Sequence, residues 1–442
     1  MNIIYMHTHD SGRYLEPYGF PVPAPNLMAL ARESTLFRHC YCAGPTCSPS
    51  RASLLTGTWP HVNGMIGLAH RGFALNDYSK HLANYLAGQN YETALCGVQH
   101  EAERAEKIGY HKLLQQERGK AQYISEPEAY DLDSAKKAAA YLSERAGKEG
   151  NFFLAFGMIN THRKFPDPKG RVDAAYVQPP FPLYDNQNNR EDMAAFITSA
   201  SVVDRCVGIV TETLKKTGLD KNTLLIFTTD HGIAFPHMKC SLYDTGIGVA
   251  LMVKYPGNPG AGKALDALVS QIDLFPTICE LCGLPKPGWL DGVSLTPVLN
   301  GTTAEVNQAV FSEVTYHASY EPKRCIRTDR YKLIRHFDYH NRLPPSNTDN
   351  GLSKQFMLEA GMFKRPVPRE QLFDLWLDPV ERENLIDEPA YQDVYRDLSL
   401  RLWNWMEHSG DPLLKYPYRV PAPQGAIANT LECIQPEYEE YE

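Results

Sequence analysis

The sequence lacks several features that would assign it at once to a broad class of protein. It has no run of eighteen apolar residues, so we predict no contact with a membrane. Its first residues, MNIIYM, lack the basic start and apolar core of a secretory signal, which favours a cytoplasmic location. No cluster of basic residues stands out at a formal net charge of -8, and this argues against a nucleic-acid partner.

Cysteine usage excludes further classes. Ten cysteines in 442 residues are too few for a disulfide scaffold, and Cys40, Cys42 and Cys47 lack the C-x-x-C spacing of many zinc and redox sites. The sequence also contains no internal repeat and no low-complexity segment. An anionic substrate would therefore have to be met by local arginine, lysine or metal charge rather than by the charge of the whole protein.

What is present is the composition of a soluble globular protein, 43% hydrophobic and 22% charged, in a chain long enough for two or three units. Near-continuous apolar runs, which are typical of buried strands, alternate with amphipathic stretches. The expected strands cover residues 2–6, 151–159, 223–230 and 248–255. The expected helices cover residues 24–37, 78–89, 134–147 and 191–218. This alternation predicts an α/β protein with a largely parallel sheet.

The last third of the chain has a different character. Residues 258–305 are rich in proline and glycine and are expected to be irregular. After them we expect antiparallel strands and a closing helix, in residues 311–317, 325–337, 370–379 and 395–408. We therefore predict a catalytic domain over residues 1–305 and a smaller α+β subdomain over residues 306–442. The final EYEEYE is expected to be a solvated tail.

Three of the predicted strands end in polar residues. These endings are HTHD at residues 7–10, NTHR at 160–163 and TDHG at 229–232. Ligand sites in open α/β sheets gather at the carboxyl ends of strands, so we expect the three endings to converge.

Residues 47–57, CSPSRASLLTG, form the most informative motif. Pro49 suits the first position of a helix, which would place Cys47 at the helix N-terminus, where free N–H groups and the helix dipole favour an anion. Arg51 follows one turn later on the same face and can hold an oxyanion. The alternative is a buried structural cysteine beside a helix-capping serine.

This C-x-P-x-R run followed by Thr-Gly resembles the signature of the type I sulfatases. The similarity extends over NIIYMHTHDSGRY, TLLIFTTDHG, RTDRYKLIRHF and LFDLWLDPVERENL. Within the family, NGMIGL at 63–68, INTHRKF at 159–165 and FSEVTYH at 311–317 are most similar to heparan N-sulfatases, the sulfamidases. The resemblance implies an alkaline phosphatase superfamily fold, with a mixed, largely parallel sheet sandwiched by helices and a small antiparallel C-terminal subdomain.

The resemblance also implies the chemistry. A maturation enzyme would oxidise Cys47 to formylglycine (3-oxoalanine), whose hydrate attacks sulfur. Asp10, Asp230 and the modified residue 47 would bind one divalent metal, with calcium expected from the family. Here His9 and His231 stand where the family usually has Asp and Asn, and imidazole suits zinc or manganese better, so the identity of the metal stays open. His9 could instead hydrogen-bond a ligand without touching the metal, and the two aspartates could be helix caps.

Three further positions match the family. The resemblance implies that His100 acts as a base, while His162 and Lys239 protonate the leaving atom and Arg51 and the metal hold the sulfuryl oxygens. The family lysine of a G-K-x-H run is absent, because this chain has Val98 in its place.

The expected substrate is a small anionic sulfated sugar, with Tyr316 and His317 as candidate substrate contacts. Glucosamine N-sulfate is the favoured substrate, and a sugar O-sulfate is the alternative. His231 also resembles the related phosphonate and phosphodiester monoester hydrolases. A third hypothesis is a non-catalytic anion-binding protein in which Cys47 is never converted.

Overall fold

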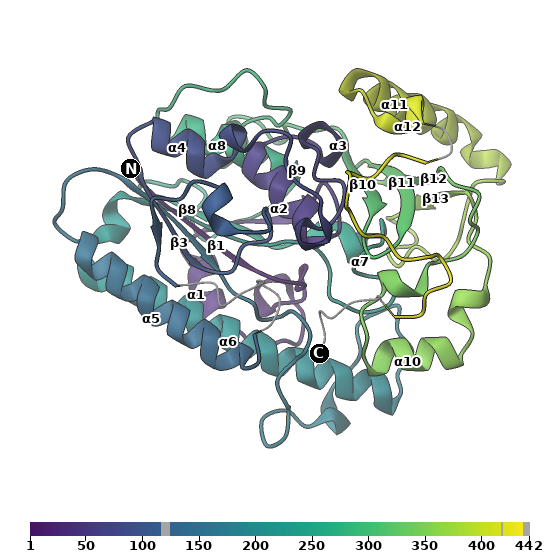
Figure 1. Cartoon of the computed structure of the whole chain (residues 1–442), viewed down its shortest axis with the longest axis horizontal. Coiled ribbons are helices and arrows are strands. Elements are labelled where there is room, and N and C mark those ends of the chain that lie inside the picture. The colour runs from purple at the N-terminus through teal and green to yellow at the C-terminus, as the bar shows by residue number, and fades with distance from the viewer. Residues whose placement is uncertain (116–123, 417–418, 436–442) are drawn as a thin grey trace.

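The structure is a computed structural model that describes residues 1–115, 124–416 and 419–435. The acidic ending EYEEYE lies outside these described residues. Two sheets lie side by side, the larger one between layers of helices and the smaller one towards the C-terminus (Figure 1). The predicted fold class is confirmed.

The large sheet has nine strands in the described part of the chain. Eight of them follow one another in the order β4-β3-β5-β1-β6-β8-β2-β7, and the ninth, β9, pairs with β2. Its centre is parallel, since β3, β5, β1 and β6 pair in that order with parallel register, whereas β8 runs antiparallel to β6 and β2. The strands are β1 (Asn2–Thr8), β2 (Thr35–Tyr41), β3 (Glu92–Gly97), β4 (Lys112–Leu113), β5 (Phe152–Gly157), β6 (Thr223–Thr229), β7 (Gly248–Val249), β8 (Leu251–Lys254) and β9 (Ala264–Ser270).

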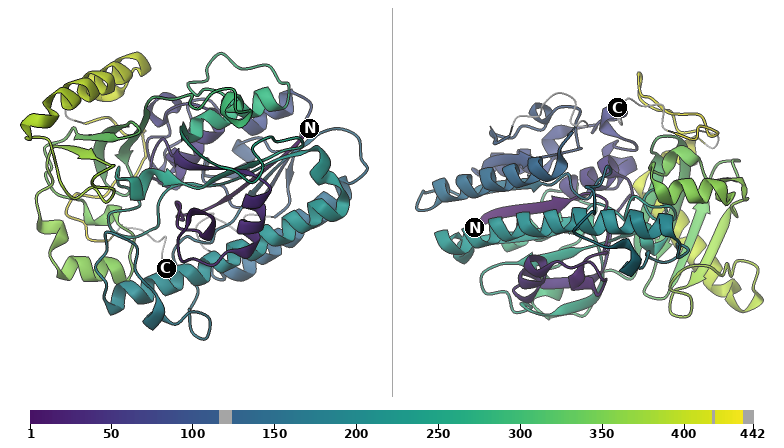
Figure 2. Two further views of the ribbon diagram at one scale, coloured as in Figure 1. Left: turned by 180° about the vertical axis from the view of Figure 1, so that it is seen from behind. Right: turned by 90° about the horizontal axis from the view of Figure 1, so that it is seen from below.

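Alternating side chains of the buried strands fill two cores, one on each face of the sheet. Along β1, Ile3 and Tyr5 join a cluster with α2, α4 and α8, whereas Ile4 and Met6 join a cluster with α1, α5 and α6. The two helical layers are visible on opposite faces of the sheet in Figure 2. The helices are α1 (Pro25–Arg32), α2 (Cys47–Thr56), α4 (Leu82–Gly88), α5 (Pro127–Arg145), α6 (Gln187–Thr217) and α8 (Leu274–Leu281).

Helix α6 is long and apolar enough to cross a membrane by length and composition alone. However, 72% of its most apolar eighteen-residue window is buried inside the protein, where it packs along α5 and α1. It ends at Gly218, as predicted, in the left-handed conformation that favours glycine at a helix C-terminus. The apolar residues of α6 therefore serve the core.

Two sequence predictions were wrong in detail. The helix expected over residues 24–37 ends at Arg32, and residues from Thr35 onward form β2. The stretch 258–305 was expected to be irregular, but it contains β9, which pairs in parallel with β2, and α8. Both errors have one cause, because β2 and β9 are paired with each other and their short apolar runs are ambiguous without the partner.

The second sheet is antiparallel, with the strands β10 (Val310–Tyr316), β11 (Tyr320–Arg327), β12 (Tyr331–His336) and β13 (Glu370–Asp374) in sequential order. Helices α11 (Gln392–Ser409) and α12 (Pro412–Lys415) accompany it, while α10 (Leu352–Glu359) packs on α6. The Glu313 N–H donates to Ala43 O at 2.9 Å and the Tyr316 N–H donates to Ile66 O at 3.0 Å, so β10 is tied to the larger unit. The division between residues 305 and 306 stays a prediction.

Gly97 is the last residue of β3 and precedes the segment that carries His100. A substitution at Gly97 tests how closely β3 packs on β5. Its φ is +80°, and an added Cβ would collide with the carbonyl oxygen of Gly157 on β5. We expect Gly97→Ala to lower the free energy of unfolding by about 2–5 kcal/mol, because a left-handed backbone and a steric clash both oppose it. Urea denaturation measures this.

The matched control is Gly218→Ala. Gly218 has a similar φ of +73° but nothing within 4 Å of the added Cβ, so we expect a cost of only about 1 kcal/mol. Equal costs for the two variants would show that the contact with Gly157 does not constrain the fold.

Candidate active site

The ends of the parallel strands meet, as predicted. The Asp10 N–H, just after β1, donates to Asp230 Oδ1 at 2.8 Å, just after β6. The hydroxyl of Thr161, after β5, donates to His9 O at 2.5 Å. Asp10 has a φ of +36°, a left-handed conformation that is uncommon for a non-glycine residue and is typical of functional sites.

Helix α2 brings Cys47 to these strand ends, with one correction to its start. The helix begins at Cys47 rather than at Pro49, and its first backbone hydrogen bond runs from the Ser50 N–H to Thr46 O at 3.0 Å. Pro49 therefore lies inside the first turn, where its missing N–H still costs nothing. The prediction that Cys47 lies at a helix N-terminus is unchanged.

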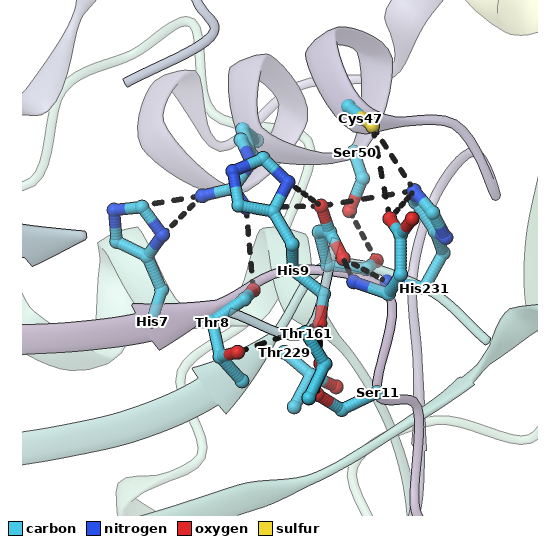
Figure 3. Close-up of polar contacts among 12 residues, drawn as sticks. His7, Thr8, His9, Ser11, Cys47, Ser50, Thr161, Thr229 and His231 are labelled. Carbon is cyan, nitrogen blue, oxygen red and sulfur yellow. Dashed lines mark hydrogen bonds and ion pairs between the residues drawn. The ribbon is translucent and has the colours of Figure 1, made fainter. Parts of the chain in front are cut away.

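The Cys47 sulfur faces the polar strand ends. Its Sγ lies 3.4 Å from His231 Nε2 and 3.9 Å from Asp10 Oδ1, and Figure 3 shows it directed towards His231. Burial raises the pKa of the Cys47 thiol well above its usual value, although the charge of Lys239 acts in the opposite direction. As an unmodified thiol, this side chain is therefore a poor nucleophile at neutral pH.

Two buried cations neutralise the carboxylates. The Arg51 guanidinium donates to Asp230 Oδ2 at 3.0 Å, and Lys239 Nζ donates to Asp10 Oδ2 at 3.0 Å and to Asp349 Oδ2 at 2.8 Å. Burial opposes ionisation of Asp349, yet the charge of Lys239 holds its pKa below the usual value. The two cations and the three carboxylates of Asp10, Asp230 and Asp349 together carry one net negative formal charge.

A group of three histidines, His9, His100 and His162, lies close to Cys47. The His9 and His100 rings are 4.7 Å apart, and the His9 and His162 rings are 5.4 Å apart. Burial, followed by the charge of Arg51, lowers the pKa of His9 and of His100 well below the usual value. Both imidazoles are therefore neutral at neutral pH and can accept a proton or bind a metal.

The donor set fits a divalent metal. Ligand atoms of His9, Asp10, Cys47 and Asp230 all lie within 4.8 Å of one another, and His231 Nε2 lies 3.3 Å from Asp10 Oδ1. Buried carboxylates in such a cluster favour a bound cation. Imidazoles beside these carboxylates suit manganese, zinc or iron as well as, or better than, calcium.

The structure separates the two candidate substrate contacts. His317 lies near Lys239 and Asp349, and burial followed by the charge of Lys239 lowers its pKa well below the usual value. Tyr316 is 1% exposed, packs on Phe73 and donates its hydroxyl hydrogen bond to Val420 O at 2.6 Å. Tyr316 therefore lies in a hydrophobic cluster, and within the described part of the chain its hydrogen bond and ring contacts are made away from the strand ends.

Several residues of the site had no distinctive sequence signal. Asp349 follows a short turn of the second unit and matches no motif, so only its contact with Lys239 reveals it. Ser50 donates to Asp230 O at 2.6 Å, and its place within the Cys47 motif could have pointed to it. His7 stacks on Tyr5 with ring centroids 4.7 Å apart and contacts Arg51.

Fold and site together define a hydrolase-type centre for a tetrahedral anion, with two buried cations, a cluster of metal-type ligands and a helix N-terminus. The sulfatase family model matches residues 2–284, and the chain belongs to the sulfatase family. A second model, described as N-sulphoglucosamine sulphohydrolase, C-terminal, matches residues 233–344.

Curated relatives cover most of the chain. An ulvan-active sulfatase of Formosa agariphila is 28% identical over 95% of this chain and 82% of its own length. Human N-sulphoglucosamine sulphohydrolase is 28% identical over 93% of this chain and 89% of its own length. Among solved structures, a phosphonate monoester hydrolase from Silicibacter pomeroyi has a TM-score of 0.72 at 19% identity, covering 92% of this chain and 95% of its own.

Lys239 allows a test of the buried charge network. We expect Lys239→Met to lower the free energy of unfolding by about 3–5 kcal/mol, because Asp10 and Asp349 would lose their shared buried cation. Asp349→Asn in the Lys239→Met background should restore part of the loss. Urea denaturation of the metal-free protein measures both.

The control is Lys215→Met, which removes the cation of a pair with Glu33 whose side chains are 51% and 39% exposed. We expect a change of less than about 1 kcal/mol there. A Lys239→Met protein no less stable than the Lys215→Met protein would contradict this account of the network.

Proposed function

We propose that the protein hydrolyses a sulfate ester or N-sulfate of a sugar, after oxidation of Cys47 to formylglycine and with one divalent metal bound. The observation that carries the proposal is the position of Cys47 at the start of α2, 3.4 Å from His231 and 3.9 Å from Asp10. The family match over residues 2–284 supports the same reaction class.

The charge balance suits a tetrahedral anion with a single negative charge. The five ion-paired side chains around Cys47 carry one net negative formal charge, so a divalent metal would leave one net positive charge. A sulfate monoester carries one negative charge and matches it, as do the phosphonate monoesters and phosphodiesters of the second candidate function. Helix N-terminal N–H groups beside residue 47 add to the stabilisation of an anion.

Each residue has a proposed role. Oxidised residue 47 supplies the attacking hydroxyl of its hydrate, and the metal supplies positive charge that lowers the pKa of that hydroxyl. Arg51 and the metal would hold the sulfuryl oxygens, because Arg51 is a buried cation at the strand ends. Lys239 and His162 donate a proton to the leaving oxygen or nitrogen, and the neutral His100 accepts a proton as sulfate is released.

We propose glucosamine N-sulfate as the favoured substrate. The match of the N-sulphoglucosamine sulphohydrolase C-terminal model to residues 233–344 supports it, as does the similarity to the human enzyme. A sugar O-sulfate is the alternative, and similarity to a hexuronate-2-O-sulfatase and an endo-4-O-sulfatase of Bacteroides thetaiotaomicron supports it. Comparing release of sulfate from N-sulfated and 6-O-sulfated glucosamine separates the two.

His231 favours a second candidate function, hydrolysis of phosphonate or phosphodiester monoesters. Its Nε2 lies 3.7 Å from Asp230 Oδ2 and 3.3 Å from Asp10 Oδ1, so an imidazole stands among the expected metal ligands. Rates on an aryl sulfate and an aryl phosphonate, measured on one preparation, decide between the classes. A faster phosphonate reaction would contradict the sulfatase proposal.

Cys47→Ala tests the nucleophile. We expect it to abolish turnover of an aryl sulfate, a loss of at least about a thousandfold, while the protein still unfolds cooperatively. Intact mass of the unsubstituted protein should show the conversion of the thiol to an aldehyde at residue 47.

Two outcomes would count against this assignment. Normal activity in Cys47→Ala would place the nucleophile elsewhere. An unconverted thiol in a preparation made together with a maturation enzyme would favour the non-catalytic anion-binding alternative.

A further inference from the structure

Cys47 belongs to a second set of ligand atoms that excludes the carboxylates. Atoms of His9, Cys47 and His100 that can bind a metal all lie within 4.8 Å of one another. They come from three separate elements, the ends of β1 and β3 and the start of α2. The set consists of two nitrogens and one sulfur.

The two imidazoles of this set have no hydrogen-bond partner among the described residues. His9 is 0% exposed and His100 is 7% exposed, and all four of their ring nitrogens are buried without a partner. The nearest approach is between His9 Nδ1 and Asp230 Oδ2, at 3.5 Å. A buried nitrogen without a partner costs free energy, and binding a cation removes that cost.

Two cations face this set of ligand atoms, because Arg51 acts on both imidazoles and Lys239 acts on His100. The cations that face the set are already paired, Arg51 with Asp230 at 3.0 Å and Lys239 with Asp10 at 3.0 Å. Because each cation is paired with a carboxylate, Arg51 and Lys239 repel a bound metal ion less strongly than unpaired cations would.

We infer that, while residue 47 is still a thiol, His9, His100 and Cys47 bind a zinc ion. Zinc prefers nitrogen and thiolate sulfur in tetrahedral geometry, and three protein ligands leave a fourth position open. As the zinc–sulfur bond forms, the Cys47 S–H bond breaks and its proton goes to solvent, with no change of oxidation state.

The geometry needs only a small adjustment. In a tetrahedral site with zinc–nitrogen bonds of about 2.0 Å and a zinc–sulfur bond of about 2.3 Å, neighbouring ligand atoms lie roughly 3.3–3.6 Å apart. The three atoms here lie within 4.8 Å of one another, so closure by at most about 1.5 Å brings them into range.

This site overlaps the proposed site of the catalytic metal, because both sets include His9 and residue 47. It differs in using His100 in place of the carboxylates of Asp10 and Asp230. A thiolate bound to zinc is protected from oxidation, so zinc would oppose conversion of residue 47 in the folded protein. The inference needs an unconverted thiol and does not depend on the sulfatase activity proposed above.

The test uses the full-length chain with an unconverted thiol at residue 47, verified by intact mass and stripped of metal. Cobalt(II) serves as the probe, because a cobalt–thiolate bond gives a charge-transfer absorption band. We expect the band to saturate at one cobalt per chain and to disappear when zinc is added. Excess calcium should leave it unchanged, because calcium prefers oxygen ligands.

Variants assign the ligands. We expect Cys47→Ser to abolish the band, and His9→Asn and His100→Asn each to weaken zinc binding by at least about tenfold. Cys206→Ser is the matched control, because Cys206 is a buried thiol within α6, and it should bind zinc like the unsubstituted chain. Thermal unfolding checks that each variant is folded.

Three results would overturn the inference. They are the absence of a charge-transfer band, displacement of cobalt by calcium, and zinc binding in a folded Cys47→Ser or His100→Asn protein equal to that of the Cys206→Ser control. The sulfatase proposal is tested on converted protein with an aryl sulfate, so a failure of either proposal is recognised without reference to the other.

Discussion

The close approach of two buried aspartates controls the architecture of this site. Asp10 and Asp230 end neighbouring parallel strands, and the backbone N–H of Asp10 donates to the carboxylate of Asp230 at 2.8 Å. Two carboxylates cannot be buried together without compensation. Arg51 from α2 and Lys239 from the loop after β6 provide it, so the elements that carry the cations are held against the strand ends.

The same requirement ties the C-terminal part of the chain to the site. Asp349 lies in the segment between β12 and α10, yet its carboxylate accepts from Lys239 at 2.8 Å. β10 adds backbone hydrogen bonds from Glu313 to Ala43 and from Tyr316 to Ile66. The small antiparallel sheet thus completes the electrostatic environment of the catalytic part of the chain.

Two imidazoles, those of His9 and His231, stand among the expected metal ligands of this site. His9 faces His100 and His162. His231 instead faces the Cys47 sulfur, as Figure 3 shows, and also the carboxylate of Asp10. Val98 is 2% exposed and donates its N–H to Gly157 O at 3.0 Å. A bound metal would add positive charge to a site whose five ion-paired side chains carry one net negative formal charge.

Much of the fold and of the site was predictable, because their signals are local. Apolar runs located β1, β5 and β6, Gly218 marked the end of α6, and the motif beginning at Cys47 located the helix that faces the strand ends. Signals that depend on distant partners were missed. β2 and β9 need each other to be recognised as strands, and Asp349 gains its role only from contact with Lys239.

By itself, the sequence determined the periodicities, the helix terminus at Cys47 and the chemical types of the side chains that end each strand. Only the tertiary structure decided which of these side chains share a pocket, which cation neutralises which carboxylate, and that Tyr316 lies in a hydrophobic cluster. The physical reason is that strand pairing, burial and charge compensation act between residues far apart in the chain. Local sequence patterns do not show which distant residues come into contact.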